Sequence, residues 1–225
     1  LTGCTLYTGP TSALTPTTSP TTGPANGGDG GGDNNVCFAG DQTVQLESGS
    51  KKQIKDVRLG ERVLISDANH ALKFATVVFK PHRSDNTDAA TFHSIQTESR
   101  CLKVTGGHLV LVQPECETSG PLKLLRADQV LGGMCVSTAT DLEKVTGTSK
   151  VEGSGVHTLV TDDPAGHIVV NGVRASSFGE NHDAVNAYYH VHRALFRVMP
   201  ASFMDSWAVV KANAMLGNLA AKIFT

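Results

Sequence analysis

The sequence predicts a mainly β domain followed by a shorter helical segment. Short runs rich in β-branched residues cover 62–65, 75–79, 108–112 and 167–170, each bounded by turn residues. An Asn-Gly dipeptide follows the last of these runs, and the apolar period changes from strand-like to helical after about residue 180. This pattern is typical of a fold with many short strands and an appended helical part.

Asn171-Gly172 is a strong hairpin signal, because it separates the run 168–170 from Val173. A type I′ turn needs positive φ at both central positions, which Asn and Gly adopt most readily.

The segment 54–63 resembles the segment 127–136. When Val57 is aligned with Val130, Gly60 meets Gly133 and Val63 meets Val136 without a gap. The alternative is a chance match between two turn-then-strand segments. Agreement at three positions favours an internal duplication.

Residues 1–36 differ in composition from the rest of the chain. They contain no Lys or Arg and are dominated by Thr, Pro, Ser and Gly. Such a segment buries too little apolar surface to offset its ordering entropy, so we expect a disordered linker whose Thr/Pro part is stalk-like. The chain begins with Leu1, and we expect it to be a piece of a longer protein.

Residues 179–225 form the predicted helical tail. One face of a predicted helix carries Ala184, Tyr188, Val191, Leu195 and Val198, and Pro200 ends this helix. A second apolar stretch runs from 203 to 224. Such helices pack on a core, bind a partner or lie on a membrane surface.

Composition excludes several classes of function. The net charge is −2 and aromatic residues make up 5%, which argues against a nucleic-acid partner. The five cysteines form no CxxC pair, so we expect no zinc site, and His190 and His192 face different ways on a helix. No apolar run reaches the length of a membrane-spanning helix.

Cys37 stands where the linker meets the first patterned segment. Its sulfur can reach the carbonyl of Val36 through a five-membered ring and convert that amide into a thioester. The fold must then activate the peptide and protonate the departing amine. A buried structural cysteine is the alternative, which Cys37 taken alone favours.

The string Thr105-Gly106-Gly107-His108 opens a predicted strand. Histidine is a natural proton donor near neutral pH, and the Thr hydroxyl can hydrogen-bond the scissile peptide. Glycines allow another backbone segment to approach closely. The motif is weak alone and gains weight beside Cys37 and the internal duplication.

These strings resemble the Hint domain, the self-processing module of hedgehog C-terminal regions and inteins. The matching strings lie within 36–63, 92–97, 105–109 and 168–176, and the resemblance covers about 37–178. It implies a flat β horseshoe of two pseudo-symmetric halves. It also implies that Cys37 is the nucleophile, that His108 protonates the leaving amine, and that Thr105 orients the scissile bond.

Three positions depart from the hedgehog pattern. His82, with Asp85 nearby, stands where hedgehog has an acidic residue that activates a sterol, so we expect His82 as a second-step base while the departure puts cholesterol in doubt. Ser177 or Ser176 replaces a cysteine. Val36 replaces a glycine, and its β-branch crowds attack on the scissile carbonyl.

We therefore expect one self-cleavage at Val36-Cys37, with transfer of the N-terminal part to water, a sterol or another nucleophile. Splicing is not expected, because the chain lacks the C-terminal His-Asn of inteins. No cofactor is expected to be required, and the tail is expected to contact a sterol or membrane lipid. Resemblance and composition indicate a secreted protein. The alternative is an inactive Hint fold that serves as a secreted interaction module.

Overall fold

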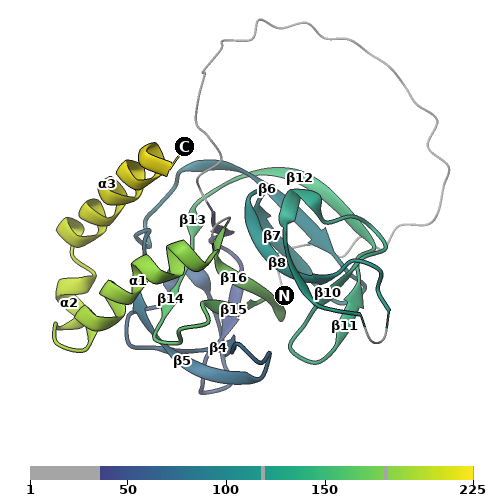
Figure 1. The fold of residues 1–225 in the computed structure, drawn as a ribbon, viewed down its shortest axis with the longest axis horizontal. Helices are drawn as coiled ribbons and strands as arrows, with labels where there is room; N and C mark the ends of the chain where they lie inside the picture. Colours follow the sequence, from purple (N-terminus) through teal and green to yellow (C-terminus); the bar gives the residue numbers. More distant parts are fainter. Residues whose placement is uncertain (1–35, 118–119, 180–181, 225) are drawn as a thin grey trace, which may run out of the picture.

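The computed structural model describes residues 36–117, 120–179 and 182–224, and it consists of a β domain flanked by a layer of helices (Figure 1). The mainly β fold class with a C-terminal helical segment is thereby confirmed. The expected linker, residues 1–36, lies outside the described residues except for Val36.

The strands are short and belong to three sheets. Their bounds are β1 (Phe38–Ala39), β2 (Thr43–Gln45), β3 (Lys51–Gln53), β4 (Arg62–Ser66), β5 (Leu72–Phe79), β6 (Ala89–Gln96), β7 (Cys101–Thr105), β8 (His108–Gln113), β9 (Lys123–Arg126), β10 (Cys135–Ser137), β11 (Leu142–Lys144), β12 (Gly147–Ser154), β13 (Val156–His157), β14 (Val160–Thr161), β15 (His167–Val170) and β16 (Val173–Gly179). One sheet has the order β12-β6-β7-β1-β13, and a second has β11-β10-β8-β16-β15-β2-β3 with β9 paired to β8. The third is β14-β5-β4.

The sequence echo corresponds to a structural repeat. Single-turn 3-10 helices, Ile54–Asp56 and Ala127–Gln129, occupy equivalent places and each is followed by a glycine at positive φ, Gly60 and Gly133. Each of these glycines donates its N–H to a carbonyl of a later strand or turn, at 2.8 and 2.9 Å respectively. The duplication expected from the sequence is therefore present in backbone geometry as well as in residue type.

The predicted hairpin at Asn171-Gly172 is confirmed. Both residues have positive φ, 49° and 78°, and join β15 to β16. The Asn171 side chain accepts hydrogen bonds from the N–H and hydroxyl of Thr43 and donates to Gln42 and to the Cys101 carbonyl. The Asn171 side chain thus hydrogen-bonds to both β2 and β7, which belong to different sheets.

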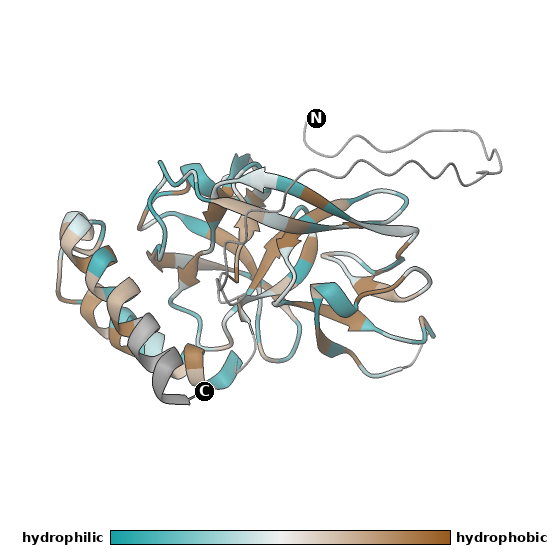
Figure 2. Cartoon of the chain, turned by 90° about the horizontal axis from the view of Figure 1, so that it is seen from above, coloured by the Kyte–Doolittle hydropathy of each residue, from teal (hydrophilic) through white to brown (hydrophobic). Residues whose placement is uncertain are grey.

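The core lies between the sheets, where apolar residues from both halves pack together (Figure 2). Phe38, Ile54, Leu102 and Ile168 in this core have no solvent exposure. A second cluster joins Phe79 on β5 to the helical layer.

The helical layer comprises α1 (His182–Phe196), α2 (Ala201–Met204) and α3 (Trp207–Phe224). Of the roles expected for the apolar face of the first helix, packing on the core does not occur, since Ala184, Val191, Leu195 and Val198 are exposed and Tyr188 is half-buried. The buried side chains of α1 are Asn186, Tyr189, His192 and Arg193.

Open backbone carbonyls explain why polar residues of α1 face inward. Arg193 donates to the Thr161 carbonyl at 2.8 Å, and Asn186 donates to the Pro164 carbonyl at 2.6 Å. Leaving a buried carbonyl without a hydrogen bond costs more free energy than exposing a valine to water. Hydrogen bonding therefore decides which face of the helix packs on the β domain.

Replacing Asn171 with Gly should lower the free energy of unfolding by about 2–4 kcal/mol, because Gly keeps the positive φ while the hydrogen bonds to Thr43, Gln42 and Cys101 are lost. Urea unfolding in a Cys37→Ala background measures this. Asn69→Gly, at an exposed turn, is the control and should change little. Equal effects of the two substitutions would contradict the tethering role of Asn171.

Candidate active site

The Cys37 backbone is held by two hydrogen bonds to Thr105. The N–H of Cys37 donates to Thr105 Oγ1 at 3.0 Å, and the N–H of Thr105 donates to the Cys37 carbonyl at 2.9 Å. The next residue, Phe38, pairs with Val104 on β7 and His157 on β13. The nitrogen of the Val36-Cys37 bond therefore receives a hydroxyl contact from the residue that the sequence indicated.

The Cys37 side chain is a free thiol with only 1% exposure. Burial, with a smaller contribution from Asp88, raises the pKa of this thiol far above its ordinary value. Sγ lies 3.1 Å from His82 Nε2. Burial lowers the pKa of His82, so the neutral ring offers a lone pair to the protonated thiol.

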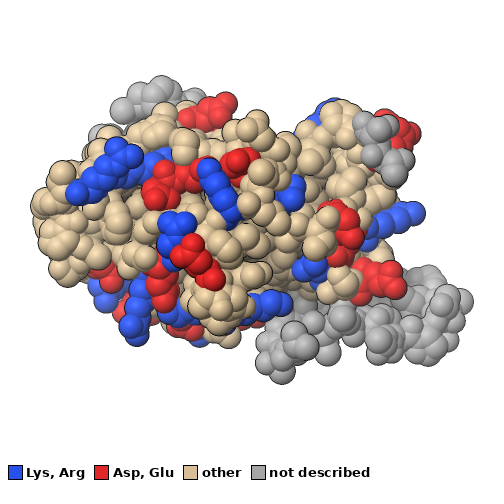
Figure 3. Space-filling model, turned by 90° about the horizontal axis from the view of Figure 1, so that it is seen from below, with Lys and Arg blue, Asp and Glu red and all other residues tan. Residues whose placement is uncertain are grey.

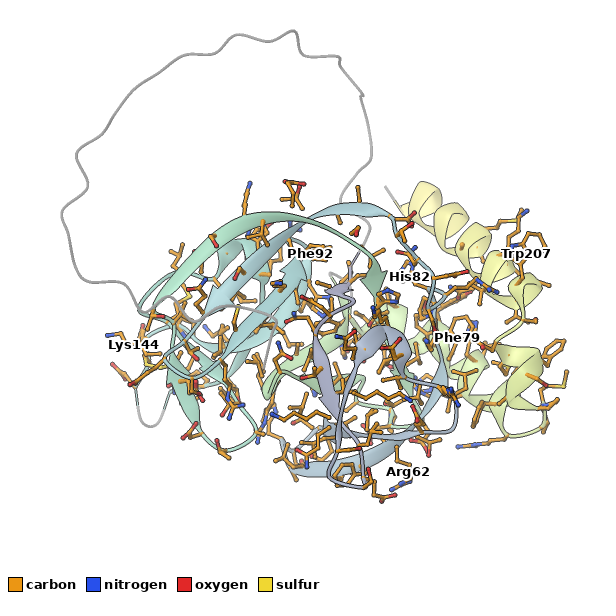
Figure 4. The ribbon with its side chains drawn as sticks, turned by 180° about the vertical axis from the view of Figure 1, so that it is seen from behind. Arg62, Phe79, His82, Phe92, Lys144 and Trp207 are labelled. Atoms are coloured by element: carbon orange, nitrogen blue, oxygen red, sulfur yellow. A yellow bond between two sulfur atoms is a disulfide. The ribbon has the colours of Figure 1, made fainter. Side chains whose placement is uncertain are left out.

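The segment that carries His82 is anchored on its N-terminal side by a buried cation. Lys80 Nζ donates to the carbonyls of Lys55 and Val57 at 3.0 and 2.7 Å and to Ser84 Oγ at 2.8 Å. In Figure 4, His82 lies between the strand that carries Phe92 and the helical layer.

His108 begins β8 and is fully buried. Its Nε2–H donates to the Ser176 carbonyl at 2.8 Å, and its ring packs edge-on against Phe38 with centroids 4.1 Å apart. Burial lowers the pKa of His108 to about 4, partly opposed by the Ser176 carbonyl. Its Nδ1 has no hydrogen-bond partner among the described residues.

Val36 lies against the strand pair that carries His108. Gly179 pairs with His108 in the sheet, and a Cβ at Gly179 would collide with the Val36 side chain and approach the Gly107 carbonyl to 3.0 Å. The scissile peptide is thus bracketed by Thr105 on one side and by the Gly179–His108 pair on the other.

Of the four side chains expected from the sequence, Thr105 and His82 contact Cys37, and His108 packs against the next residue, Phe38. Asp85 does not join them, because its exposed carboxylate pairs with Arg83 at 3.2 Å. No three His, Cys, Asp or Glu side chains in the described ranges gather as metal ligands.

Sequence reasoning missed three residues near this site. Ser176 receives His108, Asp88 acts electrostatically on Cys37 and His82, and His157 lines a cavity of about 490 Å³ beside Ala39. Both ring nitrogens of His157 are buried without a partner, and burial lowers its pKa to about 4. Ser176 ends the matched string 168–176, but it contacts His108 through its backbone carbonyl, which no sequence signal marks, and Asp88 and His157 lie outside the matched strings.

Acidification should destabilise the fold between pH 6.5 and pH 4. Over this range the unfolded chain carries a proton on His108 that the folded chain does not, so stability falls as pH falls. One unit of pKa difference corresponds to about 1.4 kcal/mol, which gives about 3 kcal/mol for this residue. Urea unfolding at pH 7 and pH 4 in a Cys37→Ala background measures the loss.

His108→Gln in the same background serves as the comparison, and it should lose about 3 kcal/mol less on acidification, since Gln does not titrate. An equal loss in both proteins would show that His108 is not held neutral by the fold.

A family model described as the Hint module matches residues 30–214. Protein hedgehog of Drosophila hydei is 30% identical over 184 residues, covering 79% of this chain and 36% of that protein. The protein of the same name from Drosophila virilis is 33% identical over 184 residues, with the same coverage of both chains. The chain thus spans about a third of the length of these relatives.

Solved structures agree on the fold. The DnaB intein from Synechocystis sp. PCC 6803 superposes with a TM-score of 0.50 and 17% identity, covering 63% of this chain and 97% of the intein. The chain therefore belongs to the Hint family and carries a module of the hedgehog/intein type.

Proposed function

We propose that this module cleaves its own chain between Val36 and Cys37 through an N-to-S acyl shift. The observation that carries the proposal is the convergence of Thr105 on the nitrogen of Cys37 and of His82 on its sulfur. A structural cysteine needs neither contact. Attack by Sγ on the Val36 carbonyl carbon forms the C–S bond, and the C–N bond to Cys37 then breaks.

The net change moves one proton from the sulfur to the nitrogen of Cys37. His82 takes the thiol proton, which suits a neutral imidazole 3.1 Å away. His108 takes a proton from solvent at Nδ1 as the tetrahedral intermediate forms and delivers it to the departing amine, while His82 releases the thiol proton to solvent, so both rings end neutral. Its low pKa makes the imidazolium a strong acid for this transfer. Thr105 orients the nitrogen throughout.

A second step transfers the N-terminal part to water, a sterol or another nucleophile. His82 has then lost its contact with a thiol and is available to deprotonate the acceptor. The cavity lined by Ala39, Gly40 and His157 offers an approach from the side of β1.

Cys37→Ala should abolish cleavage, because it removes the sulfur that attacks the Val36 carbonyl. His82→Ala and His108→Ala should each slow it by about 10²–10⁴-fold, the usual contribution of general acid–base catalysis. Gel electrophoresis of the chain behind a soluble tag, with and without dithiothreitol, gives the rates.

His190→Ala, at an exposed histidine, is the matched control and should cleave normally. Cleavage of Cys37→Ala at the same bond would refute the mechanism. A wild-type chain that stays intact with thiol would favour the alternative, an inactive Hint fold acting as an interaction module, and Val36→Gly tests whether crowding is the reason.

The helical tail supports a second proposal, contact with a membrane lipid or sterol. Trp207 and Leu216 on α3 are 61% and 53% exposed, and Val198 in the turn after α1 is 76% exposed, as is typical of a segment that lies at an interface. Trp207 projects from α3 at the edge of the molecule in Figure 4. No described helix is long and apolar enough to cross a bilayer.

Charge distribution does not favour a nucleic-acid partner. On the face shown in Figure 3, Lys and Arg side chains are interspersed with Asp and Glu. The disulfide between Cys116 and Cys135 supports an oxidising, secretory location, since such bonds are rare in the reducing cytosol.

Replacing Phe203 and Trp207 with Ser should reduce flotation with phosphatidylcholine–cholesterol vesicles several-fold in a Cys37→Ala background, because both exposed rings supply apolar contact. Leu131→Ser, at a 59% exposed position of the β domain, is the control and should float like the parent. Equal flotation of all three proteins would exclude the tail as the lipid-binding surface.

A further inference from the structure

A chain of hydrogen bonds connects the first residue of α1 to His108. His182 Nε2 lies 3.0 Å from the Ala165 carbonyl, which can only accept, so Nε2 carries the proton in the neutral ring. Nδ1 then accepts a hydrogen bond from the Ser176 hydroxyl at 2.7 Å. The Ser176 carbonyl in turn accepts the Nε2–H of His108 at 2.8 Å.

Ser176 occupies an irregular part of β16. On the β8 side the register shifts between Ala175 and Gly179, so the ladder with β8 is irregular there, whereas on the other side Ser176 pairs with His167 of β15. The Ser176 hydroxyl also accepts the N–H of Phe178 at 2.7 Å. The Ser176 hydroxyl, held by His182, therefore adds a constraint on the backbone where the pairing with β8 is irregular.

His182 itself is held firmly against the β domain. Its ring packs on Phe178 and His167, with centroids 5.6 and 5.3 Å away. Further along α1, buried Arg193 and Asn186 bind carbonyls of the β domain. The helix start is thus anchored both by ring packing and by the body of the helix.

We propose that His182 is a positioning residue for self-cleavage, which makes α1 part of the catalytic unit. It holds Ser176 so that its carbonyl fixes His108 with Nε2 protonated and leaves Nδ1 free for the scissile nitrogen. This inference rests on the proposed function of His108 as the acid.

The kinetic test compares thiol-induced cleavage rates. His182→Ala should slow cleavage about tenfold or more, because small displacements of a catalytic group are costly. His182→Gln should recover most of the rate, since an amide can donate to the Ala165 carbonyl and accept from Ser176. His190→Ala, an exposed histidine of the same helix, should cleave like the parent. A parent-like rate for His182→Ala would overturn the proposal.

Ser176→Ala provides a second variant, which leaves the helix in place and removes only the hydroxyl. If His182 acts through Ser176, the double variant should be no slower than the slower single variant. Fully additive losses would overturn the proposal.

A spectroscopic readout separates this inference from the proposed function. In uncleavable Cys37→Ala protein, ¹⁵N-imidazole NMR reports the tautomer and pKa of His108 without any cleavage. His182→Ala should shift both, whereas His182→Gln should preserve them. An unchanged His108 spectrum in folded His182→Ala would overturn the positioning role, whether or not the parent chain cleaves.

Discussion

The pair of hydrogen bonds between Cys37 and Thr105 is the constraint on which the site depends. It places Cys37 beside β7, and Val36 lies against the strand pair that carries His108. The Thr105 hydroxyl also gives the Cys37 nitrogen a side-chain partner in place of a backbone carbonyl. In the proposed acyl shift, holding the peptide in this way reduces the entropic part of the barrier.

Burial then sets the protonation of every group around that peptide. A dry interior disfavours charge, so the thiol of Cys37 stays protonated while His82 and His108 stay neutral. These three groups are therefore uncharged in the resting site. The same burial makes the fold sensitive to acid. A histidine that is neutral in the folded chain and protonated in the unfolded chain lowers the stability as the pH falls.

Much of the β domain could be predicted from sequence, because its information is local. The hairpin at Asn171-Gly172 follows from the φ values that these residue types adopt, and the repeat follows from turn glycines such as Gly60 and Gly133. The docking face of α1 could not be predicted. Its inward side is chosen by backbone carbonyls that meet Arg193 and Asn186, and apolar periodicity carries no information about open carbonyls. In the candidate site, the residues that belong to motifs could be identified from the sequence. Residues that contact them through a backbone carbonyl could not, because a carbonyl is common to every residue type.

The most direct test of the central claim is the mass of the fragment released by a small thiol. If the acyl shift occurs, dithiothreitol should release a fragment that ends at Val36 and carries dithiothreitol as its thioester, at a rate that rises with thiol concentration. Release of the free acid alone at a rate independent of thiol, cleavage at another bond, or a chain that remains intact would contradict a thioester at Cys37.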